Sequence, residues 1–314
     1  MKAYILNRLA ALIPTLLIVA TVGFLLIHLT PGDPAAVMLG DEADLKDLEM
    51  LRQQMGLDQP IPVQLLRWLG RLFRGDLGYS IFLKRPVLQA ITDRLECTLL
   101  LTVYSLIISV GLGVVMGIVA AVKHNTIVDQ IMMVLALLGV SMPSFWLGLN
   151  LIWLLALGLR WFPSSGYVPL AQGVVANMRS LFLPSFTLGF VSAAPIARMT
   201  RSSMLAVLNQ DYIRTARAKG LKEWSVILSH AFRNALIPTV TMIGMTVGGL
   251  IAGAIIVETV FALPGVGRLV ISSISRRDYP AIQGILIFTA SIYVLVNLVV
   301  DILYVYLDPR VKYL

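Results

Sequence analysis

Long apolar runs alternate with shorter polar segments along the whole chain. Runs of 17 or more residues without Asp, Glu, Lys or Arg occur at about 9–29, 98–122, 130–159, 181–197, 235–257 and 281–300. A helix of about 20 predominantly apolar residues can cross the hydrocarbon core of a bilayer. In lipid, a helix also satisfies every backbone hydrogen bond within one segment. The pattern therefore predicts an all-α, polytopic membrane protein with six transmembrane helices.

Three of the runs are less regular than the others. The first follows basic residues, as a secretory signal peptide would, but it is longer than a signal core and the sequence PGDP follows at 31–34 in place of a small-residue cleavage site. We expect it to be a membrane span. Run 130–159 should be kinked or broken at Pro143, because proline removes a helical hydrogen bond. Run 181–197 is the weakest candidate, since it is the shortest and contains two prolines.

Lys and Arg are concentrated in alternate connections. With the N-terminus inside, the inner segments hold twelve of them and the short outer connections hold five. Because positive charges near span ends disfavour translocation, both termini are predicted to be cytoplasmic, and the long segment 31–97 is left out because the rule weakens in long loops. The chain then divides into a first transmembrane helix (1–30), a periplasmic cap loop (31–97) and a five-helix transmembrane core (98–314) with a cytoplasmic loop at about 198–234.

The composition agrees with a membrane protein. Hydrophobic residues make up 58% of the chain and charged residues 13%, whereas soluble domains average roughly 45–50% and about 25%. The net charge of +8 is scattered between the apolar runs. A nucleic-acid-binding protein would gather such an excess on one solvated face, so no nucleic-acid partner is expected. Cys97 is the single cysteine and cannot form a disulfide within the chain.

Small residues recur every four positions in two of the runs. They are Ser109, Gly113 and Gly117 in the second run, and Gly244, Gly248, Gly249 and Gly253 in the fifth. Such spacing allows the backbones of neighbouring membrane helices to approach closely. Both helices are therefore predicted to face protein, either within the chain, at a subunit interface or along a transport pathway.

The sequence motifs of enzymes are missing. No Gly-Lys pair occurs, so the chain has no phosphate-binding P-loop and is not expected to hydrolyse ATP by itself. There is no HExxH or GxSxG motif, and the three histidines (28, 124 and 230) are far apart in sequence. No catalytic residue, metal site or cofactor is predicted in this chain.

The apolar runs also lack the groups that usually bind a coupling ion. Ion-driven transporters generally place ionisable side chains inside the bilayer. Asp301 follows the sixth run near its inner end, where polar groups can reach water, so we expect an interfacial role for it. Energy for any pumping must then come from a separate motor subunit.

The inner loop contains a candidate contact for such a motor. Residues 211–221 read as a helix that ends near Gly220, and a second helix should begin around Lys222. Small residues at Ala216, Ala218 and Gly220 would let this helix fit closely into a groove on another protein, and its basic residues could meet an acidic rim. The same charges would also arise from the positive-inside rule alone.

At this loop the chain resembles a known family. RTARAKG at 214–220 and RNALIP at 233–238 are similar to the coupling-helix motif of permease subunits of bacterial ATP-binding cassette (ABC) importers, in the variant found in dipeptide, oligopeptide and nickel permeases. The general family pattern has an acidic residue where this chain has Arg214. Further segments resemble the same subfamily: PGDP at 31–34, GLDQP at 56–60, SMPSFWLG at 141–148, LPGVGRL at 263–269, RDYP at 277–280 and DILYVYLDPR at 301–310.

The resemblance implies a type I ABC importer permease fold in the bacterial inner membrane, of the B-type subunit with the long first outer loop. It implies as partners a homologous second permease, two ATPase subunits that bind ATP and Mg, and a periplasmic or lipid-anchored solute-binding protein. The cap loop 31–97 and the segment 258–280 are candidate docking surfaces for that binding protein. The implied ATPase-coupling residues are Asp211, Arg214, Thr215, Ala216, Arg217, Ala218, Lys219, Gly220 and Leu221.

Several functions remain open at this stage. The resemblance favours uptake of di- or oligopeptides, with glutathione or nickel chelates as alternatives handled by closely similar permeases. A secondary transporter or channel would explain the spans without a motor. A membrane scaffold or receptor would need no pathway at all.

Overall fold

The computed structural model describes residues 2–29, 45–55, 57–80 and 82–307. The PGDP motif at 31–34 and residues 308–314 lie outside the described residues. The chain forms two compact units, one of Met1–Leu95 with Arg268–Leu295 and one of Glu96–Gly267 with Val296–Leu314. Both are built mainly of helices.

The first unit joins the two ends of the chain. It contains α1 (Lys2–Leu29), α3 (Leu45–Met55), α4 (Ile61–Leu72), the antiparallel strands β1 (Tyr79–Ser80) and β2 (Arg85–Pro86), and parts of α5 (Val87–Val122), α12 (Val266–Ser275) and α13 (Tyr279–Leu307). Its apolar contacts centre on Phe24 and Trp68, whose ring centroids are 5.6 Å apart, with Ala20 and Ile287 beside them. The polar segment after α1 therefore packs back onto that helix through α4.

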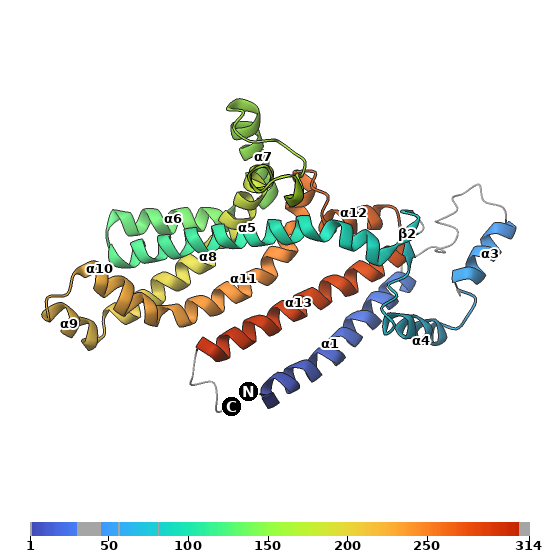
Figure 1. Ribbon diagram of the computed structural model, residues 1–314, viewed down its shortest axis with the longest axis horizontal. Helices are drawn as coiled ribbons and strands as arrows, with labels where there is room; N and C mark the ends of the chain where they lie inside the picture. Colours follow the sequence, from blue (N-terminus) through green and yellow to red (C-terminus); the bar gives the residue numbers. More distant parts are fainter. Residues whose placement is uncertain (1, 30–44, 56, 81, 308–314) are drawn as a thin grey trace. The chain divides into compact units, whose positions relative to one another are not determined.

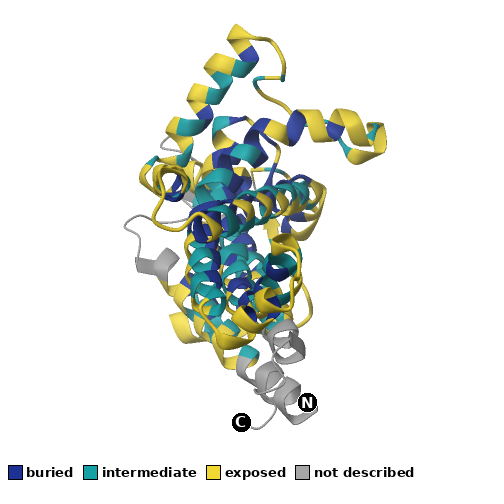
Figure 2. Cartoon of the chain, turned by 90° about the vertical axis from the view of Figure 1, so that its left-hand side faces the viewer, coloured by how far each residue is buried: buried dark blue, intermediate teal, exposed yellow. Residues whose placement is uncertain are grey.

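The second unit is a bundle in which α5, α6, α8 and α11 run side by side (Figure 1). Its elements after α5 are α6 (Ile127–Ser141), α7 (Ser144–Leu151), η1 (Ile152–Gly158), η2 (Leu170–Gln172), α8 (Val174–Leu208), α9 (Asp211–Ala218), α10 (Glu223–Ser225), η3 (Val226–Phe232) and α11 (Arg233–Val260). Buried residues lie where the helices pack and exposed residues lie on their outer sides (Figure 2).

Helices long and apolar enough to cross a membrane cover most of the predicted spans. Four qualify by themselves: Val87–Val122, Val174–Leu208, Glu223–Val260 and Tyr279–Val300. A fifth arises if Ile127–Ser141 and Ser144–Gly158 form one span, bent by 105° at the break that contains Pro143. The predicted break at this proline is confirmed. The first predicted run lies in helix α1, in which Leu12–Leu25 is an apolar stretch. The sixth span and the cytoplasmic termini stay predictions.

Several helices are longer than the apolar runs that predicted them. Helix α5 already begins at Val87, within the segment predicted as a cap, and α8 continues to Leu208, within the predicted inner loop. The weakest predicted span thus lies in a continuous helix of 35 residues that includes both prolines. Polar residues can extend a helix beyond the hydrocarbon, because the backbone hydrogen bonds continue whatever the side chain.

Small residues bring α5 and α8 into close contact. A Cβ atom at Gly117 would lie 2.5 Å from Thr200 Cβ, and one at Gly113 would lie 2.8 Å from the carbonyl oxygen of Ala193. The prediction that this ladder faces protein is confirmed. On α11 the same prediction is confirmed at Gly244, where a Cβ would lie against Val300, and at Gly253. At Gly249 a Cβ would meet open space.

Candidate functional site

The predicted helix-turn-helix of the inner loop is present as α9 and α10. Helix α9 begins at Asp211, whose negative charge suits the positive end of a helix. Ile213 and Ala216, three residues apart, lie on one side of α9 and are buried. The remaining residues of this short helix are exposed, so one side holds it to the chain and the other is free for a partner.

Gly220 ends the helix in a specific geometry. Its φ of +77° lies in the left-handed region that side chains rarely adopt. The Gly220 N–H donates to the carbonyl of Arg217 at 2.9 Å, and the Leu221 N–H donates to the carbonyl of Ala216 at 3.4 Å. These two bonds form a Schellman motif, which satisfies the last carbonyls of a helix. The predicted C-terminal glycine is therefore confirmed, and a Cβ at this position would meet open space.

An ion pair closes the turn between the two helices. The Arg217 Nη2 atom lies 2.6 Å from Glu223 Oε1, and Nε lies 3.2 Å from each carboxylate oxygen. The hydrogen bond to Glu223 raises the pKa of Arg217, so the guanidinium stays charged. Asn234 donates a further bond of 2.8 Å to the Tyr212 hydroxyl, which fixes the start of α9 to the start of α11.

Beneath α9 lies a buried apolar cluster that belongs to the spanning helices. Its members are Ala121 of α5, Met204 of α8, Ile213 and Ala216 of α9, Val226 and Ala231 of η3, and Ala235 of α11. Removing apolar surface from water stabilises such a cluster by roughly 25 cal/mol of free energy per Å². A force applied to α9 would therefore act on three long helices through packed side chains.

The nine residues predicted from sequence fall into two sets. Ala216 is only 7% exposed and packs into the chain's own cluster, so it supports α9 from below. The other eight, Asp211, Arg214, Thr215, Arg217, Ala218, Lys219, Gly220 and Leu221, are exposed.

Two further exposed aromatic residues lie on this surface and are not among the nine predicted from sequence. Trp224 on α10 is 70% exposed and Tyr212 is 43% exposed, both beside the predicted contact residues in the chain. A large aromatic side chain in a short polar loop was the available signal, since tryptophan is enriched at binding surfaces.

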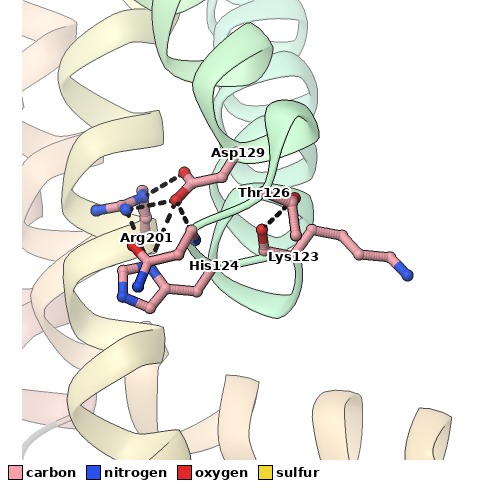
Figure 3. A network of polar contacts seen from close by, with 6 residues as sticks. Lys123, His124, Thr126, Asp129 and Arg201 are labelled. Atoms are coloured by element: carbon pink, nitrogen blue, oxygen red, sulfur yellow. Dashed lines mark hydrogen bonds and ion pairs between the residues drawn. The ribbon is translucent and has the colours of Figure 1, made fainter.

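An ion pair between the buried Asp129 carboxylate and the half-buried Arg201 guanidinium links α6 and α8 within the same unit (Figure 3). Arg201 donates from Nε to Asp129 Oδ1 and from Nη2 to Oδ2, both at 2.7 Å. The Asn125 N–H donates to the same carboxylate at 3.1 Å, and His124 Nδ1 lies 3.1 Å from Arg201 Nη2. No sequence pattern predicts this network, because Asp129 and Arg201 are far apart in sequence and lie on different helices.

The segment 258–280, predicted as part of a docking surface, contains a buried carboxylate. Glu258 is fully buried, and Thr98 Oγ1 donates to its Oε1 at 2.6 Å. The same hydroxyl accepts a hydrogen bond of 2.9 Å from the Val266 N–H. Gly265 lies directly against the Glu258 carboxylate, with no room for a Cβ. Glu258 therefore braces the loop after α11 from inside.

A second brace lies in the first unit. Asp278 accepts a hydrogen bond from the Ser80 hydroxyl and both residues are buried. The Arg276 guanidinium lies 3.5 Å from the centroid of the Phe82 ring, a favourable cation–π contact. The two predicted docking segments, 31–97 and 258–280, are thus joined at these positions, and exposed residues such as Arg276 remain for contact with a partner.

The described part of the chain thus combines long apolar helices with an exposed helix-turn-helix on a buried apolar base, as in a polytopic membrane protein. The comparisons identify its family. One family model, the binding-protein-dependent transport system inner membrane component, matches residues 113–313, and the N-terminal model of such membrane components matches residues 1–102. The chain belongs to this family of inner-membrane transport components, which confirms the resemblance found in the sequence.

Named relatives cover the whole chain. The "Putative peptide transport system permease protein" of Brucella abortus (strain 2308) is 48% identical over 313 residues, covering 100% of both chains. The glutathione transport system permease protein GsiC of Salmonella paratyphi A is 46% identical over 313 residues, again covering 100% of both. Among solved structures, the MetNI methionine ABC transporter in inward-facing conformations matches with a TM-score of 0.56 at 17% identity, covering 67% of this chain and 93% of that chain. This likeness supports the fold.

Proposed function

We propose that the chain is the permease subunit of an ATP-driven ABC importer, and that with a homologous second permease it forms the pathway for di- or oligopeptides. The substrate is delivered by a periplasmic or lipid-anchored binding protein, and two separate ATPase subunits bind ATP and Mg. The observation that carries this proposal is the exposed helix-turn-helix of α9 and α10, residues 211–225, which packs on a buried apolar cluster. This segment is called the elbow below. Family membership and the peptide permease relative support it.

The coupling residues of this proposal are the exposed ones of α9 and its turn, from Asp211 to Leu221, with Trp224 added. They would seat in a cleft of the ATPase subunit. Binding of ATP there would favour one arrangement of the spanning helices, and the elbow would transmit that preference as a population shift. ATP and Mg would bind in the ATPase subunits, because the sequence of this chain contains no Gly-Lys pair and thus no P-loop.

The first test compares two substitutions at Gly220 in the complete transporter in liposomes. Both substitutions place a side chain at a position whose φ is +77°, which strains the backbone. Asparagine tolerates this conformation better than most residues. Only tryptophan also adds a large side chain to the exposed surface. We expect Gly220→Asn to retain ATP-driven uptake of a labelled dipeptide. We expect Gly220→Trp to insert normally and to hydrolyse ATP without uptake. Normal uptake by Gly220→Trp would refute the coupling role.

Glutathione is the second candidate substrate, because the GsiC relative is 46% identical over the whole chain. The test uses the complete transporter with its own binding protein and measures ATP-dependent uptake of labelled dipeptides, glutathione and a nickel chelate side by side. Preferential dipeptide uptake supports the proposal. Preferential glutathione uptake would assign the same machinery to the other substrate, and uptake without ATP would favour a secondary transporter or channel.

A further inference from the structure

The Asp129–Arg201 ion pair restricts how α6 and α8 can move relative to each other, and it is called the joint below. The guanidinium approaches the carboxylate with two parallel hydrogen bonds, each of 2.7 Å. This arrangement defines both the distance and the angle between the two side chains. Asp129 is only 4% exposed, and leaving such a carboxylate without its partner would be costly. The pair therefore strongly favours one relative position of α6 and α8.

The joint continues a close packing between the same two helices. Ala136 of α6 lies in one buried cluster with Ala193, Ala194 and Ala197 of α8. A Cβ at Gly139 would lie 2.9 Å from the carbonyl oxygen of Phe190, so the helix backbones approach closely there as well. The contact thus runs along both helices and ends in the ion pair.

The ion pair lies on the part of α8 that leads to the elbow. Helix α8 ends at Leu208, and α9 begins at Asp211. Met204, between Arg201 and the end of α8, belongs to the cluster beneath α9. A displacement of α9 therefore acts directly on the segment that carries Arg201.

We infer that Asp129 and Arg201 are positioning residues that make α6 move together with α8 and the α9–α10 elbow during transport. The inference rests on the proposed function, since it assigns the route by which motion of the elbow reaches α6. His124 and the Asn125 N–H hold the carboxylate in place from the turn before α6. Without the pair, α8 would still follow the ATPase, but α6 would follow it less closely.

The first experiment measures labelled dipeptide uptake per ATP hydrolysed by the complete transporter. Asp129→Asn keeps the side-chain shape and removes the charge, and Arg201→Gln replaces the guanidinium with a shorter, neutral amide. We expect both to retain ATP hydrolysis while uptake per ATP falls about five-fold or more, as for loss of a typical coupling between sites. Lys123→Gln is the matched control, because its side chain belongs to the same turn and points away from the network (Figure 3). An unchanged ratio in both variants would overturn the inference.

The second experiment measures the distance between α6 and α8 directly. Spin labels are placed at Ile127→Cys, which is 74% exposed, and at the exposed Ala206→Cys, with the buried Cys97 replaced by Ala. In the transporter with native Asp129 and Arg201 we expect the same narrow distance distribution with and without a non-hydrolysable ATP analogue. In Asp129→Asn we expect a broader distribution that shifts with nucleotide.

A distance that already changes with nucleotide in the native pair would overturn the inference, even if the charge variants fail to assemble. Failure of the proposed function gives a different result. Normal uptake in Gly220→Trp would remove the coupling role of the elbow, whereas a constant α6–α8 distance would still show that the two helices move as one body.

Discussion

Arg217 on α9 reaches across the Gly220 turn to Glu223 on α10, with the guanidinium Nη2 atom 2.6 Å from the carboxylate Oε1 atom. Both side chains are about half exposed, at 43% and 55%. Exposed ion pairs contribute only about 0.2–1 kcal/mol to the free energy of unfolding. The structural effect of this pair is to fix the angle between α9 and α10, and the elbow depends on that angle.

We therefore expect Arg217→Gln and Glu223→Gln to leave the thermal unfolding of the purified protein nearly unchanged. ATP-driven uptake should fall by up to about five-fold, the factor that corresponds to roughly 1 kcal/mol. The exchanged pair, Arg217→Glu with Glu223→Arg, should recover part of the loss. If it performs no better than the single variants, the two residues act through separate contacts with the ATPase.

Trp224 offers a large apolar surface beside the elbow. Because it is 70% exposed in this chain, its removal should cost the fold little. As a buried anchor in the complex, it should contribute about 2 kcal/mol to binding, which is roughly 30-fold in affinity. We expect Trp224→Ala to weaken binding of the ATPase subunits by about this factor in a titration with nanodisc-embedded permease. Trp153→Ala, with 69% exposure in η1, is the matched control and should bind normally.

Close contact of α5 and α8 depends on the absence of a side chain at Gly117. A Cβ there would lie 2.7 Å from the carbonyl oxygen of Ala197, and a backbone atom cannot easily move away. Gly117→Ala should therefore lower the free energy of unfolding by about 1–3 kcal/mol. Gly111→Ala is the control on the same helix, where a Cβ meets open space, and alanine should be neutral or stabilising by up to about 1 kcal/mol. Equal effects in thermal unfolding would contradict the close contact.

Gly265, in the loop after α11, lies directly against the carboxylate of Glu258 in α11. A methyl group at Gly265 would have to displace the Glu258 carboxylate from Thr98. We expect Gly265→Ala to destabilise the protein by about 1–3 kcal/mol. The same change in a Glu258→Ala background should cost clearly less, because the displaced group is gone. Additive losses in thermal unfolding would show that the two residues act independently.

The sequence was most informative about features determined by neighbouring residues. The apolar runs predicted the long helices, Pro143 predicted the break, and Gly220 predicted the end of α9, because each depends on local backbone geometry or on solvation by lipid. The sequence also predicted that Gly113 and Gly117 face protein, and their partner proved to be α8.

The sequence does not show which side of a short helix is buried. Ala216 belongs to the stretch predicted to contact the ATPase, and the structure places it in the apolar cluster beneath α9, whereas Trp224 of α10 is exposed. On a helix of only eight residues the two sides are difficult to assign from sequence. The packing of α9 on η3 and α8 determines which side is buried.

The order of apolar and polar residues by itself determined that this chain is a helical membrane protein with a short helix-turn-helix between two apolar runs, since lipid solvation and helix termination act over short stretches of chain. Only the tertiary structure paired Asp129 with Arg201 and Thr98 with Glu258. Such pairs join helices far apart in the sequence, and the choice among many possible partners is made by the close packing of whole helices, which no local pattern records.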